Sequence, residues 1–216
     1  MRDWTRLRAF AGACGVAGAV ALFAYFVAPL FVGWPYAGGT GSEIASFALP
    51  RPWFFFAGAW LQSVGATLSV VFLLALVALA GMSNRLEGLM TIVGSAALLA
   101  VVLVETSFLI ATAVAAEGGD TATVGAAFTM VNGVFMRVYP LAPAPLTFIG
   151  IGLVIRASLI LPAWLGSVAL ALGGAFVLAG VIEIFSFAGV IAAIVLGVGE
   201  GLWIAAASIA LLRASS

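Results

Sequence analysis

The sequence predicts an all-α bundle of membrane-spanning helices, and two observations lead to that prediction. Of the 216 residues, 65% are apolar and only 7% are charged, whereas soluble domains are about half apolar and a quarter charged. The apolar residues also fall into runs of about 20 residues, the length that crosses a bilayer core of about 30 Å as a helix. The chain is therefore expected to be an integral membrane protein with the lipid bilayer as its first partner.

Six apolar runs are expected to cross the membrane, and together they form a single transmembrane domain over residues 1–216. Their approximate ranges are 9–32, 54–80, 89–116, 141–155, 163–184 and 187–212. The first is longer than the apolar part of a secretory signal, about 7 to 15 residues, so we expect it to remain as an anchor. The stretch GMSNRLEG between the second and third runs is a short polar turn, which predicts two tightly joined antiparallel helices.

Proline residues shape the later spans. Pro140, Pro143 and Pro145 precede the fourth run, so its start is expected to be kinked or unwound. Pro162 opens the fifth run at the first-turn position that a helix tolerates. Residues 121–137 form a further apolar stretch, which we interpret as an outer amphipathic or re-entrant segment rather than a seventh span. A seventh span would place Arg156 outside and leave no loop before the prolines.

The arginines predict the orientation, because short loops rich in Lys and Arg stay in the cytoplasm. With the N-terminus inside, only Arg51 and Arg137 of the eight basic residues fall outside. Both termini are therefore expected to be cytoplasmic, with residues 33–53 as an outer loop. The exclusive use of arginine, together with abundant Ala, Gly and Val, suggests a bacterial genome, so the expected location is the bacterial inner (plasma) membrane.

The absence of lysine and histidine narrows the chemistry. It excludes a lysine Schiff base and the commonest protein ligand of haem, copper and zinc. Cys14 is the only cysteine, so an internal disulfide and a thiolate metal cluster are excluded as well. No catalytic motif is present, and we expect neither an enzyme nor a cofactor. The net charge of zero gives no reason to expect nucleic acid as a partner.

Three glutamates stand inside apolar runs, where a carboxylate costs about 2.5 to 3.5 kcal/mol. Glu105 and Glu200 are expected within the hydrocarbon core, with Glu200 the deeper, and Glu183 is expected near the outer interface. No arginine is expected at matching depth, so we predict that Glu105 and Glu200 are protonated at neutral pH and donate hydrogen bonds. The three glutamates suggest a series that descends from Glu183 at the mouth through Glu105 to Glu200.

Other polar residues in the second and third spans leave two interpretations open. Gln62 and Thr106 are expected at similar depth, so a contact between them is predicted. In the functional interpretation they join the glutamates in a proton or cation relay or a polar-substrate site. In the structural interpretation, protonated glutamates clamp helices together. The stretch LGVGEGLW around Glu200 fits both, because glycines allow close helix packing and also loosen a helix beside a site.

Short motifs in the last two thirds of the chain resemble those of an uncharacterised (domain-of-unknown-function) family of bacterial six-span integral membrane proteins. The motif residues are Gly150 and Gly152, then Leu161, Pro162, Trp164, Leu165 and Gly166, then Glu200 and Trp203, with Glu105 as the acid of the third span. Ala163 stands where that family often has a basic residue. The resemblance implies the six-span fold and no particular activity.

Two functions are compatible with these observations. The first is a transport-type membrane protein that is proton- or cation-linked through its intramembrane glutamates. The alternative is a non-catalytic accessory or scaffolding subunit whose glycine-rich faces pack against a membrane-protein partner or a second copy of the chain. Replacement of Glu200 by Gln is expected to abolish an activity in the first case and assembly in the second.

Overall fold

The computed structural model describes residues 2–35, 38–185 and 190–214, and every regular element in these ranges is helical. The elements in chain order are α1 (Arg2–Val32), α2 (Gly41–Ala48), α3 (Pro52–Leu79), α4 (Leu86–Glu117), α5 (Thr121–Gly133), the π-helix η1 (Val134–Val138), α6 (Pro143–Ser158), α7 (Ala163–Phe185) and α8 (Val190–Arg213).

The prediction of an all-α bundle with six membrane spans is confirmed. Six helical stretches in the described part of the chain are long and apolar enough to cross a bilayer. They are Trp4–Val32, Pro52–Leu79, Leu86–Glu117, Thr121–Ser158, Ala163–Glu183 and Ile194–Arg213. The protein is therefore a multi-pass integral membrane protein. The expected last span began at residue 187, and residues 187–189 lie outside the described ranges.

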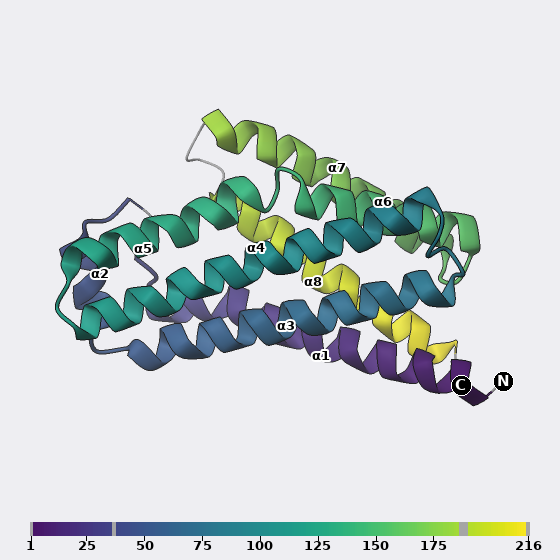
Figure 1. Ribbon diagram of the computed structural model, residues 1–216, viewed down its shortest axis with the longest axis horizontal. Coiled ribbons are helices and arrows are strands. Elements are labelled where there is room, and N and C mark those ends of the chain that lie inside the picture. The colour runs from purple at the N-terminus through teal and green to yellow at the C-terminus, as the bar shows by residue number, and fades with distance from the viewer. Residues whose placement is uncertain (1, 36–37, 186–189, 215–216) are drawn as a thin grey trace.

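The long helices lie along one direction, and the bundle has two distinct ends (Figure 1). One end carries the first turn of α1, the last turn of α8 and the α3–α4 and α6–α7 turns; we call it the terminal end. The opposite end carries α2 and the α4–α5 turn, and we call it the α2 end. Helix α1 begins and helix α8 ends at the terminal end, so the chain crosses the bundle an even number of times. Two termini on the same side of a membrane require such an even number.

Each long helix packs on specific neighbours. Helix α1 packs on α3 and α8, while α3 also packs on α4, and α6 fits between α4 and α7. A cluster of buried apolar side chains, which includes Phe72, Leu76, Phe148, Ile151 and Trp203, fills the bundle between these helices. A second cluster near the α2 end joins α2, α3, α4 and α5. The glutamate site lies in a part of the bundle that these apolar clusters surround.

The fourth candidate span is broken in the middle. Its second part, α6, lies within a few residues of the predicted 141–155, and its first part covers the segment 121–137 that was predicted to lie at the outer side or to re-enter. Residues 121–137 form α5 and most of η1, and α5 runs along α4 from the α2 end toward the middle of the bundle (Figure 1). The break at 139–142 has a covalent cause, since Pro140 and Pro143 lack a backbone N–H and proline disfavours helical conformation in the preceding residue. The whole stretch Thr121–Ser158 counts as one candidate span.

Helices α4 and α6 approach each other closely at two glycines. A Cβ atom built on Gly94 would lie 2.6 Å from the backbone nitrogen of Thr147, and one built on Gly150 would lie 2.7 Å from that of Thr91. Such distances are too short for any side chain, so both positions require glycine. Without a hydrophobic driving force between helices in lipid, this close backbone packing is the means by which small residues hold them together.

Candidate functional site

Glu105 lies on α4 in the interior of the bundle, and its side chain is 1% exposed. The Tyr25 hydroxyl, which comes from α1, donates a hydrogen bond to Oε1 of Glu105 at 3.2 Å. The other oxygen, Oε2, is buried and has no hydrogen-bond partner among the described residues. Glu105 therefore has one carboxyl oxygen whose hydrogen-bonding capacity is not used by the described residues.

Three polar side chains next to Glu105 connect α3 to α4. The Thr106 hydroxyl donates to Oε1 of Gln62 at 3.2 Å, and the Ser63 hydroxyl donates to Thr106 at 3.2 Å. Gln62 and Glu105 both line the small cavity described below. The structure thus places Gln62 and Thr106 in contact beside Glu105. Both are almost fully buried, which means that their hydrogen bonds stabilise the α3–α4 pair in the absence of water.

Glu200 lies near the middle of α8 and is 4% exposed. The hydroxyl of Tyr139 donates a hydrogen bond to its Oε2. Tyr139 directly follows η1, so its side chain comes from the break in the fourth span. The two buried glutamates therefore share one arrangement, in which a tyrosine hydroxyl from another segment of the bundle donates to one carboxyl oxygen.

A small cavity of about 20 Å³ connects the two glutamates. Glu105, Glu200, Tyr139, Gln62 and Ser69 supply its polar lining, and apolar side chains supply the rest. The hydroxyl of Ser69 is buried without a partner among the described residues. A cavity of this size holds one water molecule, which needs about 10 to 15 Å³ and two to four polar partners. The lining provides those partners, so the site can place one water between the two carboxyl groups.

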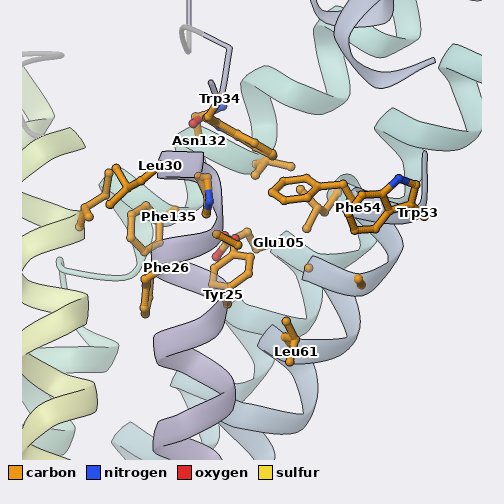
Figure 2. Close-up of a pocket in the computed structure, with 17 residues that line it drawn as sticks. Tyr25, Phe26, Leu30, Trp34, Trp53, Phe54, Leu61, Glu105, Asn132 and Phe135 are labelled. Atoms are coloured by element: carbon orange, nitrogen blue, oxygen red, sulfur yellow. The ribbon is translucent and has the colours of Figure 1, made fainter. Parts of the chain in front are cut away.

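A larger cavity of about 210 Å³ lies between Glu105 and the α2 end. Figure 2 shows Glu105 and Tyr25 at its centre, with Phe26 and Phe135 on one side and Phe54 and Trp53 on the other. Trp34 and Asn132 lie above them in the same view. No basic residue is among the described residues that line either cavity. Glu105 is thus the one carboxyl group in a described lining that is otherwise uncharged and mostly aromatic and aliphatic, with Asn132 as a further polar residue.

Phe26, Phe135 and Glu105 line both cavities, so they form the boundary between them. The rings of Phe26 and Phe135 are 5.8 Å apart, centroid to centroid, and Phe135 stacks on Tyr139 at 6.2 Å. Within LGVGEGLW, the residue that this boundary requires is Gly197, because a Cβ atom there would lie 2.8 Å from the Phe26 ring. A Cβ atom at Gly201 would meet nothing within 4 Å. Helix α8 is continuous through this stretch.

Glu183 stands apart from the other two glutamates. It lies near the end of α7, is fully buried, and has no hydrogen-bond partner for either carboxyl oxygen among the described residues. It lines neither of the two cavities. The structure therefore brings together Glu105, Glu200, Gln62 and Thr106 but leaves Glu183 outside this group.

Glu105 and Glu200 lie at different heights along the bundle. A rise of about 1.5 Å per residue places Glu105 roughly 28 Å from the first residue of α4 and Glu200 roughly 20 Å from the last residue of α8. Both of these helix termini lie at the terminal end, so Glu105 is the nearer of the two to the α2 end. No group of three or more His, Cys, Asp or Glu side chains in the described part of the chain could hold a metal ion.

Sequence reasoning did not identify the two tyrosines or the aromatic boundary. Tyr139 had a detectable signal, because it directly precedes the first proline of the predicted break, and irregular backbone inside a membrane is found where it lines a cavity. Tyr25 had no such signal, since a tyrosine near the end of a span is an ordinary interfacial residue. Comparison of the chain with protein-family models, curated proteins and solved structures finds no match.

Proposed function

We propose that the protein is a transporter of the bacterial inner membrane, linked to protons or cations through Glu105 and Glu200. The observation that carries this proposal is the small polar cavity between the two carboxyl groups. A cavity that fits one water between two buried acids supplies a path along which a proton can move from one carboxyl group to the other. A purely structural pair of glutamates has no need of it.

The chemistry follows from the cost of charge in the membrane. A carboxylate at this depth is unfavourable unless a cation or a proton neutralises it, and the described residues that line the two cavities include no basic side chain. Each glutamate therefore alternates between a protonated form and a form that is paired with a cation. The Tyr25 and Tyr139 hydroxyls stabilise the deprotonated forms by donating to one oxygen of each carboxylate.

The broken fourth span supports the same function. Discontinuous helices beside buried binding groups are a recurring feature of secondary transporters, and π-helical turns are often found at functional sites. Here η1 and the prolines that follow it deliver Tyr139 to Glu200. A break in the helix allows α5 and α6 to move relative to each other at this point.

The alternative function, an accessory or scaffolding subunit, is favoured by one observation. Gly174 lies exposed on α7, and a Cβ atom there would meet nothing within 4 Å of the described chain. An exposed glycine on a membrane helix is suited to close packing against a helix of another protein or of a second copy. Purification from native membranes in mild detergent, followed by mass spectrometry, distinguishes the two functions by the presence or absence of a stoichiometric partner.

The transport function is tested in proteoliposomes that contain a trapped pH-sensitive dye. We expect the wild-type protein to dissipate an imposed proton gradient, alone or against a Na⁺ gradient, faster than protein-free liposomes. Glu105→Gln and Glu200→Gln should each reduce the rate to that of protein-free liposomes. Glu117→Gln is the matched control, because Glu117 is the exposed last residue of α4 and should leave the rate unchanged.

Folding must be measured on the same samples. All three variants should elute as the wild-type protein does on gel filtration and unfold at a similar temperature, since Gln preserves the shape of the side chain. If the Gln variants carry the wild-type flux, proton exchange at these glutamates is refuted. If they instead fail to assemble with a co-purified partner, the accessory function is the correct one.

A further inference from the structure

The larger cavity combines features that identify a class of ligand. We propose that it binds a small lipophilic organic cation, whose charged nitrogen pairs with Glu105 and whose apolar part contacts the aromatic wall. This inference rests on the proposed transport function and names the substrate that would exchange with the proton there.

The size of the cavity limits the ligand. Its volume of about 210 Å³ exceeds the roughly 150 Å³ of an engineered apolar protein cavity that binds benzene. A ligand with one aromatic ring and a short amine or quaternary ammonium substituent therefore fits. Leu30 and Trp53, which are 75% and 63% exposed, form the rim of the cavity, so a ligand can enter without unfolding of the core.

The residues that line the larger cavity favour a positively charged ligand. Tyr25, Phe26, Trp34, Trp53, Phe54 and Phe135 supply six aromatic rings to the described lining. Faces of such rings attract cations, and quaternary ammonium groups are recognised by cages of them. An anionic ligand would meet a carboxyl group and aromatic faces with no basic residue among the described lining residues, so the cavity disfavours anions.

Glu105 is the one carboxyl group among the described residues that line this cavity. Its side chain is 1% exposed, and Oε2 has no hydrogen-bond partner among the described residues. A buried carboxyl oxygen without a partner is costly, and an ammonium group or a proton removes that cost. A lipid chain would fill the apolar volume but would leave this oxygen unpaired, which makes a purely apolar occupant the poorer fit.

Binding of the cation and of the proton at Glu105 is then mutually exclusive. When a cation enters, the Glu105 proton leaves, and the net charge of the site does not change. The small cavity offers that proton a route to Glu200 across the Phe26–Phe135 boundary. Because the cation and the proton compete for one carboxyl group, transport of the cation in one direction is coupled to transport of the proton in the other.

The test uses benzyltrimethylammonium, because its charge is permanent and any released proton must come from the protein. Calorimetric titration of the protein in lipid nanodiscs is repeated in buffers of different ionisation enthalpy. We expect saturable binding with release of about one proton per cation at a pH where Glu105 is protonated. Glu105→Gln should bind roughly 10- to 100-fold more weakly and release no proton. Glu117→Gln should bind as the wild type does.

A second variant keeps the proposal testable if Glu105→Gln does not fold. Trp53→Leu removes one exposed ring from the rim and should weaken binding about two- to fivefold, the range expected for an exposed cation–π contact. Trp60→Leu is the matched control, because Trp60 lies on the same helix with 62% exposure but does not line the cavity.

Each outcome has a clear meaning. Equal binding by Glu105→Gln, or equal binding of the neutral carbon isostere neopentylbenzene, overturns the proposal and identifies an apolar pocket that lipid can fill. Absence of binding to the wild type overturns it as well, even when the proton flux described above is present. Cation binding with proton release but no flux in proteoliposomes refutes the proposed transport function and leaves the cation site standing.

Discussion

Tyr139 and Tyr25 each donate a hydroxyl to a buried glutamate, and the two hydrogen bonds make different demands on the fold. Tyr139 comes from the break in the fourth span and is 7% exposed, so only the single water that fits the small cavity could take the place of its hydroxyl at Glu200. We expect Tyr139→Phe to lower the free energy of unfolding by about 1 to 3 kcal/mol, because it leaves a buried carboxyl oxygen without its donor. Denaturant titration in detergent measures this loss.

Tyr25→Phe serves as the comparison, because it removes the tyrosine hydroxyl that donates to Glu105. Tyr25 is only half-buried and lines the larger cavity, so water can reach the site and the loss should be smaller. An unchanged stability of Tyr139→Phe would mean that this hydroxyl does not hold Glu200. A larger loss for Tyr25→Phe than for Tyr139→Phe would contradict the ordering.

At the residue scale, the sequence indicated the acids but not their partners. Glu105 and Glu200 were recognisable because a carboxyl group inside an apolar run is costly wherever it points. Gln62 and Thr106 could be paired by counting residues along two antiparallel helices, and the structure shows that hydrogen bond. The cavities and Phe26–Phe135 could not be predicted, because they depend on how five segments pack in three dimensions.

At the element scale, the glycine contacts of α4 and α6 predict which glycines are essential. Alanine at position 150 would bring a Cβ atom to 2.7 Å from the Thr91 nitrogen and 3.0 Å from the Glu87 carbonyl oxygen, both backbone atoms. We expect Gly150→Ala to destabilise the protein by about 1 to 3 kcal/mol, because α6 must move away from α4. Thermal unfolding in detergent should show the change.

Gly174→Ala is the matched control for this substitution. A Cβ atom at Gly174 meets nothing within 4 Å, and alanine is the better helix former. The variant should therefore unfold at the wild-type temperature or slightly above it. Equal losses for the two variants would indicate that helix propensity, and not the close approach of α4 and α6, determines the cost.

The N-terminal caps of α2 and α5, at the α2 end, predict that the local stability of these two helix termini depends on pH. The Thr123 hydroxyl and backbone N–H donate to Asp120, and these hydrogen bonds hold the pKa of the exposed Asp120 below its ordinary value. Hydrogen bonds from the backbone and side chain of Thr40 lower the pKa of Glu43 in the same way. Each cap therefore stabilises its helix above the ordinary pKa and loses that effect as the pH falls through the lowered pKa.

Hydrogen exchange of the first turns of α2 and α5 should thus accelerate, relative to the intrinsic rate, as the pH drops below about 4. Asp120→Asn is the control for α5, because asparagine caps a helix without a titratable group. Its α5 terminus should show no acid-dependent step, whereas the α2 terminus of the same variant should retain one. An acid step at α5 in Asp120→Asn would assign the effect to some other group.

The elements were more predictable than their irregularities. The run lengths gave α1, α3, α4, α7 and α8 within a few residues at most ends, because about 20 apolar residues have few alternatives to a spanning helix. The prolines indicated a break before residue 141. They could not indicate that α5 runs along α4 and reaches α6 through a π-helix, since that path is decided by packing and not by local sequence.

At the scale of the whole molecule, the two ends of the bundle differ in chemistry. The turns at the terminal end carry Arg85 and Arg156, whereas the α2 end carries the caps of Glu43 and Asp120. Charge bias of this kind predicts that the terminal end faces the cytoplasm. The larger cavity lies toward the α2 end, so with this predicted orientation it would face the outer side of the membrane.

This orientation predicts the sides from which single cysteines react. In a Cys14→Ala background, an impermeant maleimide applied to intact cells should label Ala122→Cys, at the start of α5, but not Ser83→Cys or Ala163→Cys. The latter two lie in or beside turns of the terminal end, and permeabilised cells should label them. Labelling of both Ala122→Cys and Ala163→Cys from outside would show that Thr121–Ser158 re-enters the membrane without crossing it. Labelling of Ser83→Cys and Ala163→Cys, but not of Ala122→Cys, from outside would reverse the orientation and would turn the larger cavity toward the cytoplasm.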